Sequence, residues 1–259
     1  MRAIRAIEAA GGEVVVAAAD AADEAALARA LAAARARFGT LDAVIHAAGV
    51  PGRGSLALRT STEEARAVFA PKAGGLEVLV RLLGDTPLRF VALASSINAV
   101  LGSPGACDYA AANAVLDAFA ESRARPAAWQ HVVSIAWGAW RDVGMAAKLQ
   151  VPDAMRAAWQ VHLAGAIAPE AGVEAFARVL ASGRRRVVVD LVLVVPAEGI
   201  EGLGRGRRVV DAPVLFHQFL GDEGGVVHAA PQALADLVAL HFLQPGDGGV
   251  GKASAVGVL

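Results

Sequence analysis

The residues best suited to chemistry are a tyrosine and three polar side chains close to it in the sequence. Ser96 precedes Tyr109 by 13 residues and Asn113 follows it by four. Lys72 lies on the expected helix before them. A carbonyl that accepts a hydride needs a proton donor, a cation that acidifies the donor, and a group that holds the oxygen. We therefore expect Tyr109 to donate the proton and Lys72 to lower the pKa of its hydroxyl. Ser96 would hold the oxygen, and Asn113 would hold a water or main-chain group in a proton relay.

The expected elements bring these side chains together. Tyr109 and Asn113 lie one helical turn apart, so they share a face of their helix. Ser96 stands at the carboxyl end of an expected strand, the edge where open α/β sheets bind ligands. If these elements did not converge, the four residues would be ordinary polar residues of helix surfaces.

Short apolar runs alternate with longer helical patterns along the chain, which is typical of a parallel sheet with crossover helices. Ser61 and Glu64 form a capping box that predicts the start of a long helix. Expected strands cover 14–19, 44–46, 90–94, 131–136 and 187–190, and expected helices cover 23–38, 61–83, 108–123 and 169–180. Glycines crowd the sequence after 196. We therefore expect a domain over 1–195 and a tail of unknown structure over 196–259.

Composition limits the classes of protein to consider. Apolar residues make up 56% of 259, so the chain can bury a sizeable core. A net charge of −1 gives no sign of nucleic-acid or anionic-membrane binding, and no apolar run is long enough for a transmembrane helix. Cys107 is the only cysteine, so no internal disulfide is possible, a reducing cytoplasm is expected, and no metal-ligand set is visible around it.

Four long segments carry a family resemblance: LDAVIHAAGV at 41–50, FAPKAGGLEVLVRLL at 69–83, FVALASSINAVLGSPGACDYAAANAVLDAFA at 90–120, and VSIAWGAWRDVGMA at 133–146. They resemble the ketoreductase domain of modular polyketide synthases, in the short-chain dehydrogenase/reductase superfamily. The resemblance implies a Rossmann-like doubly wound parallel sheet. It also implies NADPH-dependent reduction of a β-ketoacyl thioester, bound to an acyl carrier protein, to the β-hydroxyacyl product.

The resemblance also assigns roles. In this family the lysine comes from the earlier helix and the asparagine follows the tyrosine, as Lys72 and Asn113 do here, with Ser96 and Tyr109 completing the catalytic set. The resemblance implies cofactor contacts for Asp20 at the adenine and for Ala47, Ala48 and Gly49 beneath the nicotinamide ribose, together with Lys72 and Tyr109. It implies substrate contacts around the acyl-pantetheine arm for Trp137, Trp140 and Met145.

One family feature is missing from the sequence. The family begins with a strand and a Gly-rich turn that binds the pyrophosphate at a helix N-terminus, and no such segment precedes 14–19. We therefore expect a fold that lacks its first βαβ segment, completed by other synthase domains or by another chain. The tail contains no Asp-Ser attachment site for phosphopantetheine, so the carrier protein would also come from elsewhere.

Two other interpretations remain open. The chain could be a catalytically silent ketoreductase remnant that acts as a structural or docking element of a synthase. It could also be a free-standing short-chain reductase whose start is wrongly assigned. The intact Lys72, Ser96, Tyr109 and Asn113 favour an active reductase.

Overall fold

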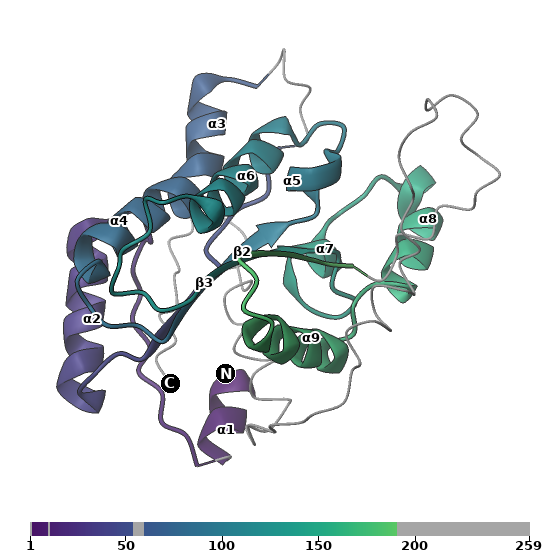
Figure 1. Ribbon diagram of the computed structural model, residues 1–259. Helices are drawn as coiled ribbons and strands as arrows, with labels where there is room; N and C mark the ends of the chain where they lie inside the picture. The colour runs from purple at the N-terminus through teal and green to yellow at the C-terminus, as the bar shows by residue number, and fades with distance from the viewer. Residues whose placement is uncertain (1, 10, 54–59, 191–259) are drawn as a thin grey trace.

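Four parallel strands form one sheet, in the order β1-β2-β3-β4 (Figure 1). A computed structural model describes residues 2–9, 11–53 and 60–190. The strands are β1 (Ala43–His46), β2 (Phe90–Ser96), β3 (Val132–Trp137) and β4 (Arg186–Val189). The sheet confirms the predicted α/β class and the four expected strands from 44 onward.

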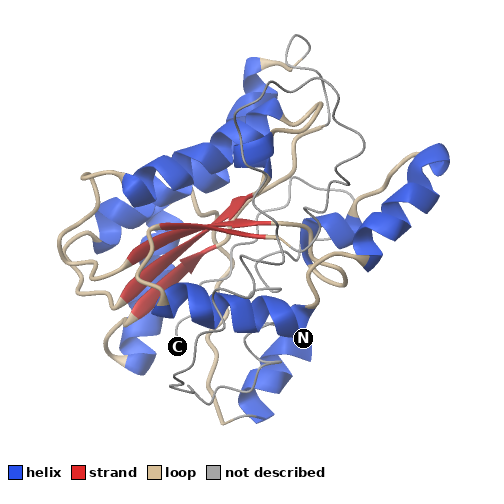
Figure 2. Cartoon of the chain, turned by 45° about the vertical axis from the view of Figure 1, so that its right-hand side comes forward, coloured by secondary structure: helices blue, strands red, loops and turns tan. Residues whose placement is uncertain are grey.

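Helices cover both faces of this sheet (Figure 2). Successive strand residues point to opposite faces. Val91 and Leu93 therefore pack in one apolar core with α2 (Glu24–Phe38), α4 (Gly75–Leu83) and α6 (Cys107–Glu121). Ala92 and Ala94 pack in the other, against α9 (Pro169–Ala181). The remaining helices are α1 (Arg2–Ala9), α3 (Thr62–Phe69), α5 (Asn98–Leu101), α7 (Gly144–Lys148) and α8 (Asp153–Ala164).

The strand expected over 14–19 is wrong, since the structure gives this segment no regular structure. A strand needs a neighbour to satisfy its backbone groups, and within the described residues the edge strand β1 pairs only with β2. Val16 is 65% exposed, whereas Ala19 is buried at the end of the segment. The apolar run is therefore only partly buried and pairs with no strand among the described residues.

The helix expected over 61–83 is divided by one π-helical turn, η2 (Ala70–Gly74). Ser61 starts α3 with the predicted capping box. Ser61 Oγ accepts a hydrogen bond from Glu64 N, and Glu64 Oε2 accepts one from Ser61 N. Pro71 then interrupts the α-helical pattern because proline has no N–H and its ring clashes with the carbonyl four residues earlier. The wider turn accommodates Pro71 and carries Lys72, and such turns often occur at functional sites.

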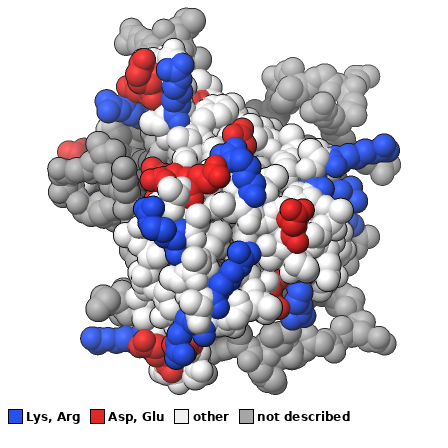
Figure 3. All heavy atoms as spheres, turned by 90° about the vertical axis from the view of Figure 1, so that its left-hand side faces the viewer, with Lys and Arg blue, Asp and Glu red and all other residues white. Residues whose placement is uncertain are grey.

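Other parts of the chain differ from expectation in smaller ways. Sequence analysis did not predict the short helix α5 between β2 and α6, nor α7 and α8. The expected boundary at 195 and the tail over 196–259 lie outside the described residues. On the face drawn in Figure 3, acidic and basic side chains are interspersed. No helix in the described ranges is both long and apolar enough to cross a membrane.

Candidate active site

The predicted site residues gather at the carboxyl edge of the sheet. His46 ends β1, Ser96 ends β2 and Trp137 ends β3. Parallel strands present their carboxyl ends on the same side, where ligands bind in this class of sheet. The small residues Ala47, Ala48 and Gly49 follow β1 directly at this edge.

Lys72 is the buried cation of the site, only 2% exposed. Its Nζ donates to Ala94 O at 2.9 Å and lies 5.8 Å from the ring centroid of Tyr109. The lysine backbone is fixed as well, because His46 Nε2 lies 3.0 Å from Lys72 O. Burial lowers the pKa of the Lys72 ammonium to about 8, and the charge of Asp117 partly offsets this.

Tyr109, the only tyrosine of the chain, projects from the first turns of α6 beside Ser96 and Asn113. Burial raises the pKa of its hydroxyl, and side-chain hydrogen bonding with Ser96 and Asn113 lowers it in part. This direction is opposite to the expectation that Lys72 lowers the pKa, because the ammonium lies near the ring and desolvation dominates. Tyr109 is therefore protonated at neutral pH.

Asn113 is fully buried on α6, one turn after Tyr109. Its Nδ2 donates to Tyr109 O at 2.7 Å, which fixes the amide. Its Oδ1 has no hydrogen-bond partner among the described residues. Buried polar atoms are nearly always satisfied, often by water. The free acceptor therefore suits the relay water expected at this position.

Gly49 leaves the space that Lys72 fills. A Cβ at this position would stand 2.9 Å from Lys72 Cε and 3.3 Å from Lys72 Nζ. Contacts under 3.0 Å force one group to move, and the lysine tip is the flexible partner. The absence of a side chain at Gly49 therefore keeps the ammonium beside Tyr109.

Replacing Gly49 by alanine is expected to lower reductase kcat/KM by about tenfold or more, since small misplacements in an active site cost this much. Gly74→Ala is the matched control, because a Cβ at Gly74 meets only Ala22 Cβ at 3.6 Å. Steady-state kinetics on both variants tests this contact. Equal activity of the two variants would show that the position of Lys72 does not depend on Gly49.

The other predicted residues lie near this edge in different environments. Asp20 Oδ1 accepts from Ala22 N at 3.0 Å in the turn before α2, so its carboxylate also has a local structural role. Trp137 and Trp140 are 6% and 4% exposed, and their ring centroids lie 5.0 Å apart. Met145 is half-buried on α7.

Sequence reasoning missed two residues that support the site. His46 was not among the predicted site residues, yet it holds the backbone of Lys72. Asp117 was not singled out, although its charge acts on Lys72. Its spacing, one helical turn after Asn113, was the available signal.

Comparisons with known proteins agree with this architecture. A family model described as the KR domain matches residues 1–142. The polyketide synthases GfsA and GfsB of Streptomyces halstedii are 43% identical over 161 residues and 40% identical over 184 residues, covering 62% and 71% of this chain. A crystal structure of a ketoreductase domain from the bacillaene assembly line is 33% identical with a TM-score of 0.62, and the match covers 72% of this chain and 45% of that chain.

The chain therefore belongs to the ketoreductase (KR) domain family of polyketide synthases, in the short-chain dehydrogenase/reductase superfamily. This is an oxidoreductase family that generally uses NAD(P)H. The chain spans 2% of the length of GfsA and 3% of GfsB.

Proposed function

We propose that the chain reduces a β-ketoacyl thioester, carried by an acyl carrier protein, to the β-hydroxyacyl product with NADPH. The observation that carries this proposal is the buried Lys72 ammonium beside the protonated Tyr109, whose hydroxyl environment includes Ser96 and Asn113. This is the proton donor, cation and oxygen-holding group that reduction of a carbonyl requires.

The roles of the side chains follow from their environments. Ser96 donates a hydrogen bond to the ketone oxygen and holds it near the Tyr109 hydroxyl. As negative charge develops on that oxygen, Tyr109 transfers its proton to it, and Lys72 stabilises the resulting phenolate. Asn113 Oδ1 holds a water that returns a proton to Tyr109. NADPH, when bound, would supply the hydride to the ketone carbon.

The residues present fit such a cofactor. Because Gly49 has no side chain, the Lys72 ammonium keeps its place beside Tyr109, the position from which it would bind a ribose. Lys72 and Tyr109 would bind the ribose hydroxyls, with Ala47, Ala48 and Gly49 lying beneath the nicotinamide ribose. Ala21 packs close to Gly75 at the start of α4. Asp20, the residue before Ala21, would contact the adenine.

Substrate binding is proposed for the residues after β3. The rings of Trp137 and Trp140 pack against each other and would form an apolar surface for the acyl-pantetheine arm. The half-buried Met145 would also contact this arm. The acyl carrier protein and other domains of a cytoplasmic synthase are the proposed partners. We also propose 1–195 as the reductase domain, followed by a separate tail over 196–259.

A reductase assay on the purified 259-residue chain tests this function. We expect saturable NADPH oxidation with a β-ketoacyl pantetheine thioester, and a higher kcat/KM with NADPH than with NADH. The thioester without the keto group is the control and should leave NADPH unchanged. A folded chain that binds NADPH without reducing the keto thioester would instead support the silent structural element.

A further inference from the structure

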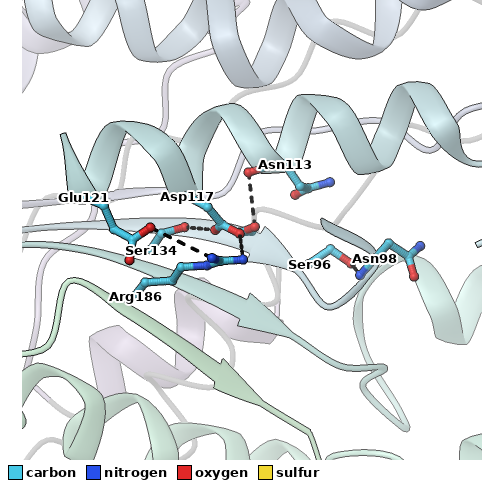
Figure 4. A network of polar contacts seen from close by, with 8 residues as sticks. Ser96, Asn98, Asn113, Asp117, Glu121, Ser134 and Arg186 are labelled. Carbon is cyan, nitrogen blue, oxygen red and sulfur yellow. Dashed lines mark hydrogen bonds and ion pairs between the residues drawn. The ribbon is translucent and has the colours of Figure 1, made fainter. Parts of the chain in front are cut away.

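A row of three residues in register crosses the sheet beneath α6, and two of them, Ser134 and Arg186, are polar (Figure 4). Leu93 of β2 lies opposite Ser134 of β3, and Ser134 lies opposite Arg186 of β4. Neighbouring residues in register share a face of the sheet. Asp117 of α6 reaches down to this row, where Ser134 Oγ donates to Asp117 Oδ1 at 2.6 Å.

Arg186 pairs with Asp117 from the side of β4. Its Nη2 lies 3.1 Å from Asp117 Oδ2, and its Nη1 lies 3.9 Å from Glu121 Oε2. The Arg186 side chain is 35% exposed, whereas the Asp117 side chain is only 4% exposed. The contact at Oδ2 lacks the alignment of a hydrogen bond. Arg186 therefore neutralises the buried carboxylate only in part.

Lys72 approaches the same row from the side of β2. Its Nζ donates to Ala94 O, and Ala94 is the residue after Leu93. The ammonium thus bonds at Ala94, one residue along β2 from the Leu93–Ser134 pair that Asp117 contacts from α6, and both charged side chains are buried. The titratable groups that face Lys72 are His46 from β1 and Tyr109 and Asp117 from α6, and Asp117 is the anion among them.

We propose that Asp117 is a positioning residue of the site, whose negative charge keeps Lys72 in the ammonium form. Arg186 weakens this effect, because its guanidinium partly neutralises the Asp117 carboxylate. The effect of Asp117 on turnover rests on the proposed reductase function, whereas its effect on Lys72 does not. A buried cation is costly without a nearby anion. Burial lowers the pKa of Lys72 and Asp117 raises it, which agrees with this arrangement.

The arrangement predicts opposite effects for the two members of one ion pair. Asp117→Asn keeps an oxygen that accepts from Ser134 but removes the anion, so the pKa of Lys72 should fall. Arg186→Gln removes the neutralising cation, so the pKa of Lys72 should rise. A purely structural role for the pair would weaken the fold in both variants without moving Lys72 in opposite directions.

NMR of the lysine side chains measures the pKa of Lys72 directly, because the chain has only three lysines, at 72, 148 and 252. The chain is labelled with [ε-13C]lysine and titrated, with the Lys72 signal assigned through its loss in Lys72→Met. We expect the pKa of Lys72 to fall in Asp117→Asn, so that its acid dissociation constant rises by about threefold or more. In Arg186→Gln the pKa should rise and the acid dissociation constant should fall, because the nearby charges change in the opposite sense. Ser134→Ala, which keeps both charges, is the control and should shift Lys72 least.

The outcomes separate the inference from the proposed function. Unchanged Lys72 titration in both charge variants, or shifts in the same direction, would overturn the role of Asp117. If Asp117→Asn fails to unfold cooperatively, the partly exposed Arg186→Gln still decides the sign. Opposite shifts in a chain without reductase activity would support the role of Asp117 and reject the proposed function alone.

Discussion

Tyr109→Phe is expected to reduce kcat for ketone reduction by about two to four orders of magnitude, the usual contribution of a general acid. The variant removes one oxygen and keeps the ring against Lys72. The fold should therefore persist, and NADPH binding, measured by fluorescence titration, should change little.

The neighbouring serines provide the matched control for this loss of a hydroxyl. Ser95 Oγ donates to the backbone oxygen of Asn113 at 3.3 Å. The Ser96 side chain instead hydrogen-bonds with the reacting hydroxyl of Tyr109. Ser95→Ala should keep activity near wild type, whereas Ser96→Ala should lose much of it. Full activity of Tyr109→Phe would remove this residue from the chemistry, and loss of NADPH binding with it would make Tyr109 a structural residue.

Lys72→Met is expected to abolish turnover and yet stabilise the fold more at neutral pH than at high pH. The folded chain lowers the pKa of Lys72 from 10.5 to about 8. Between these values the unfolded chain binds more protons, so the stability of the wild type rises with pH across this window. Below pH 8 the charged Lys72 costs the wild type about 3 kcal/mol relative to high pH, from the size of this shift. Methionine removes that cost.

Urea unfolding of both proteins at pH 7 and near pH 10.5 measures the difference. The stabilisation by Lys72→Met should be larger at pH 7 than near pH 10.5. Lys148→Met is the control, because it makes the same change at an exposed lysine outside the site. An identical effect of Lys72→Met at both pH values would show that Lys72 is not desolvated in the folded chain.

The local signals in the sequence predicted the parts of the fold that depend on local chemistry. The capping box at Ser61 and the apolar strands at 44–46 and 90–94 were confirmed. The strand expected over 14–19 was wrong because strand formation depends on a neighbour, and an apolar run does not show whether one is present. The division of the helix at Pro71 had a visible signal, since proline is poorly tolerated inside an α-helix.

The sequence predicted that Lys72, Ser96, Tyr109 and Asn113 would lie together, but it did not predict their electrostatics. The resemblance named Lys72 and Tyr109, and the structure brings them together. The direction of the Tyr109 pKa shift was wrong because burial, which a sequence does not display, raises the pKa by more than the hydrogen bonds with Ser96 and Asn113 lower it. The contribution of Asp117 was missed because its partners Ser134 and Arg186 come from two later strands.

The most direct test of the central claim follows the hydride itself. The chain is incubated with NADPH deuterated at the transferring position of C4 and a β-ketoacyl pantetheine thioester, and the product is analysed by mass spectrometry and NMR. The site described above predicts deuterium on the new carbinol carbon with the wild type, and deuterium formed at a rate lower by about two to four orders of magnitude with Tyr109→Phe. A wild-type chain that binds NADPH but leaves no deuterium on that carbon would contradict a reductase built on Lys72, Ser96, Tyr109 and Asn113.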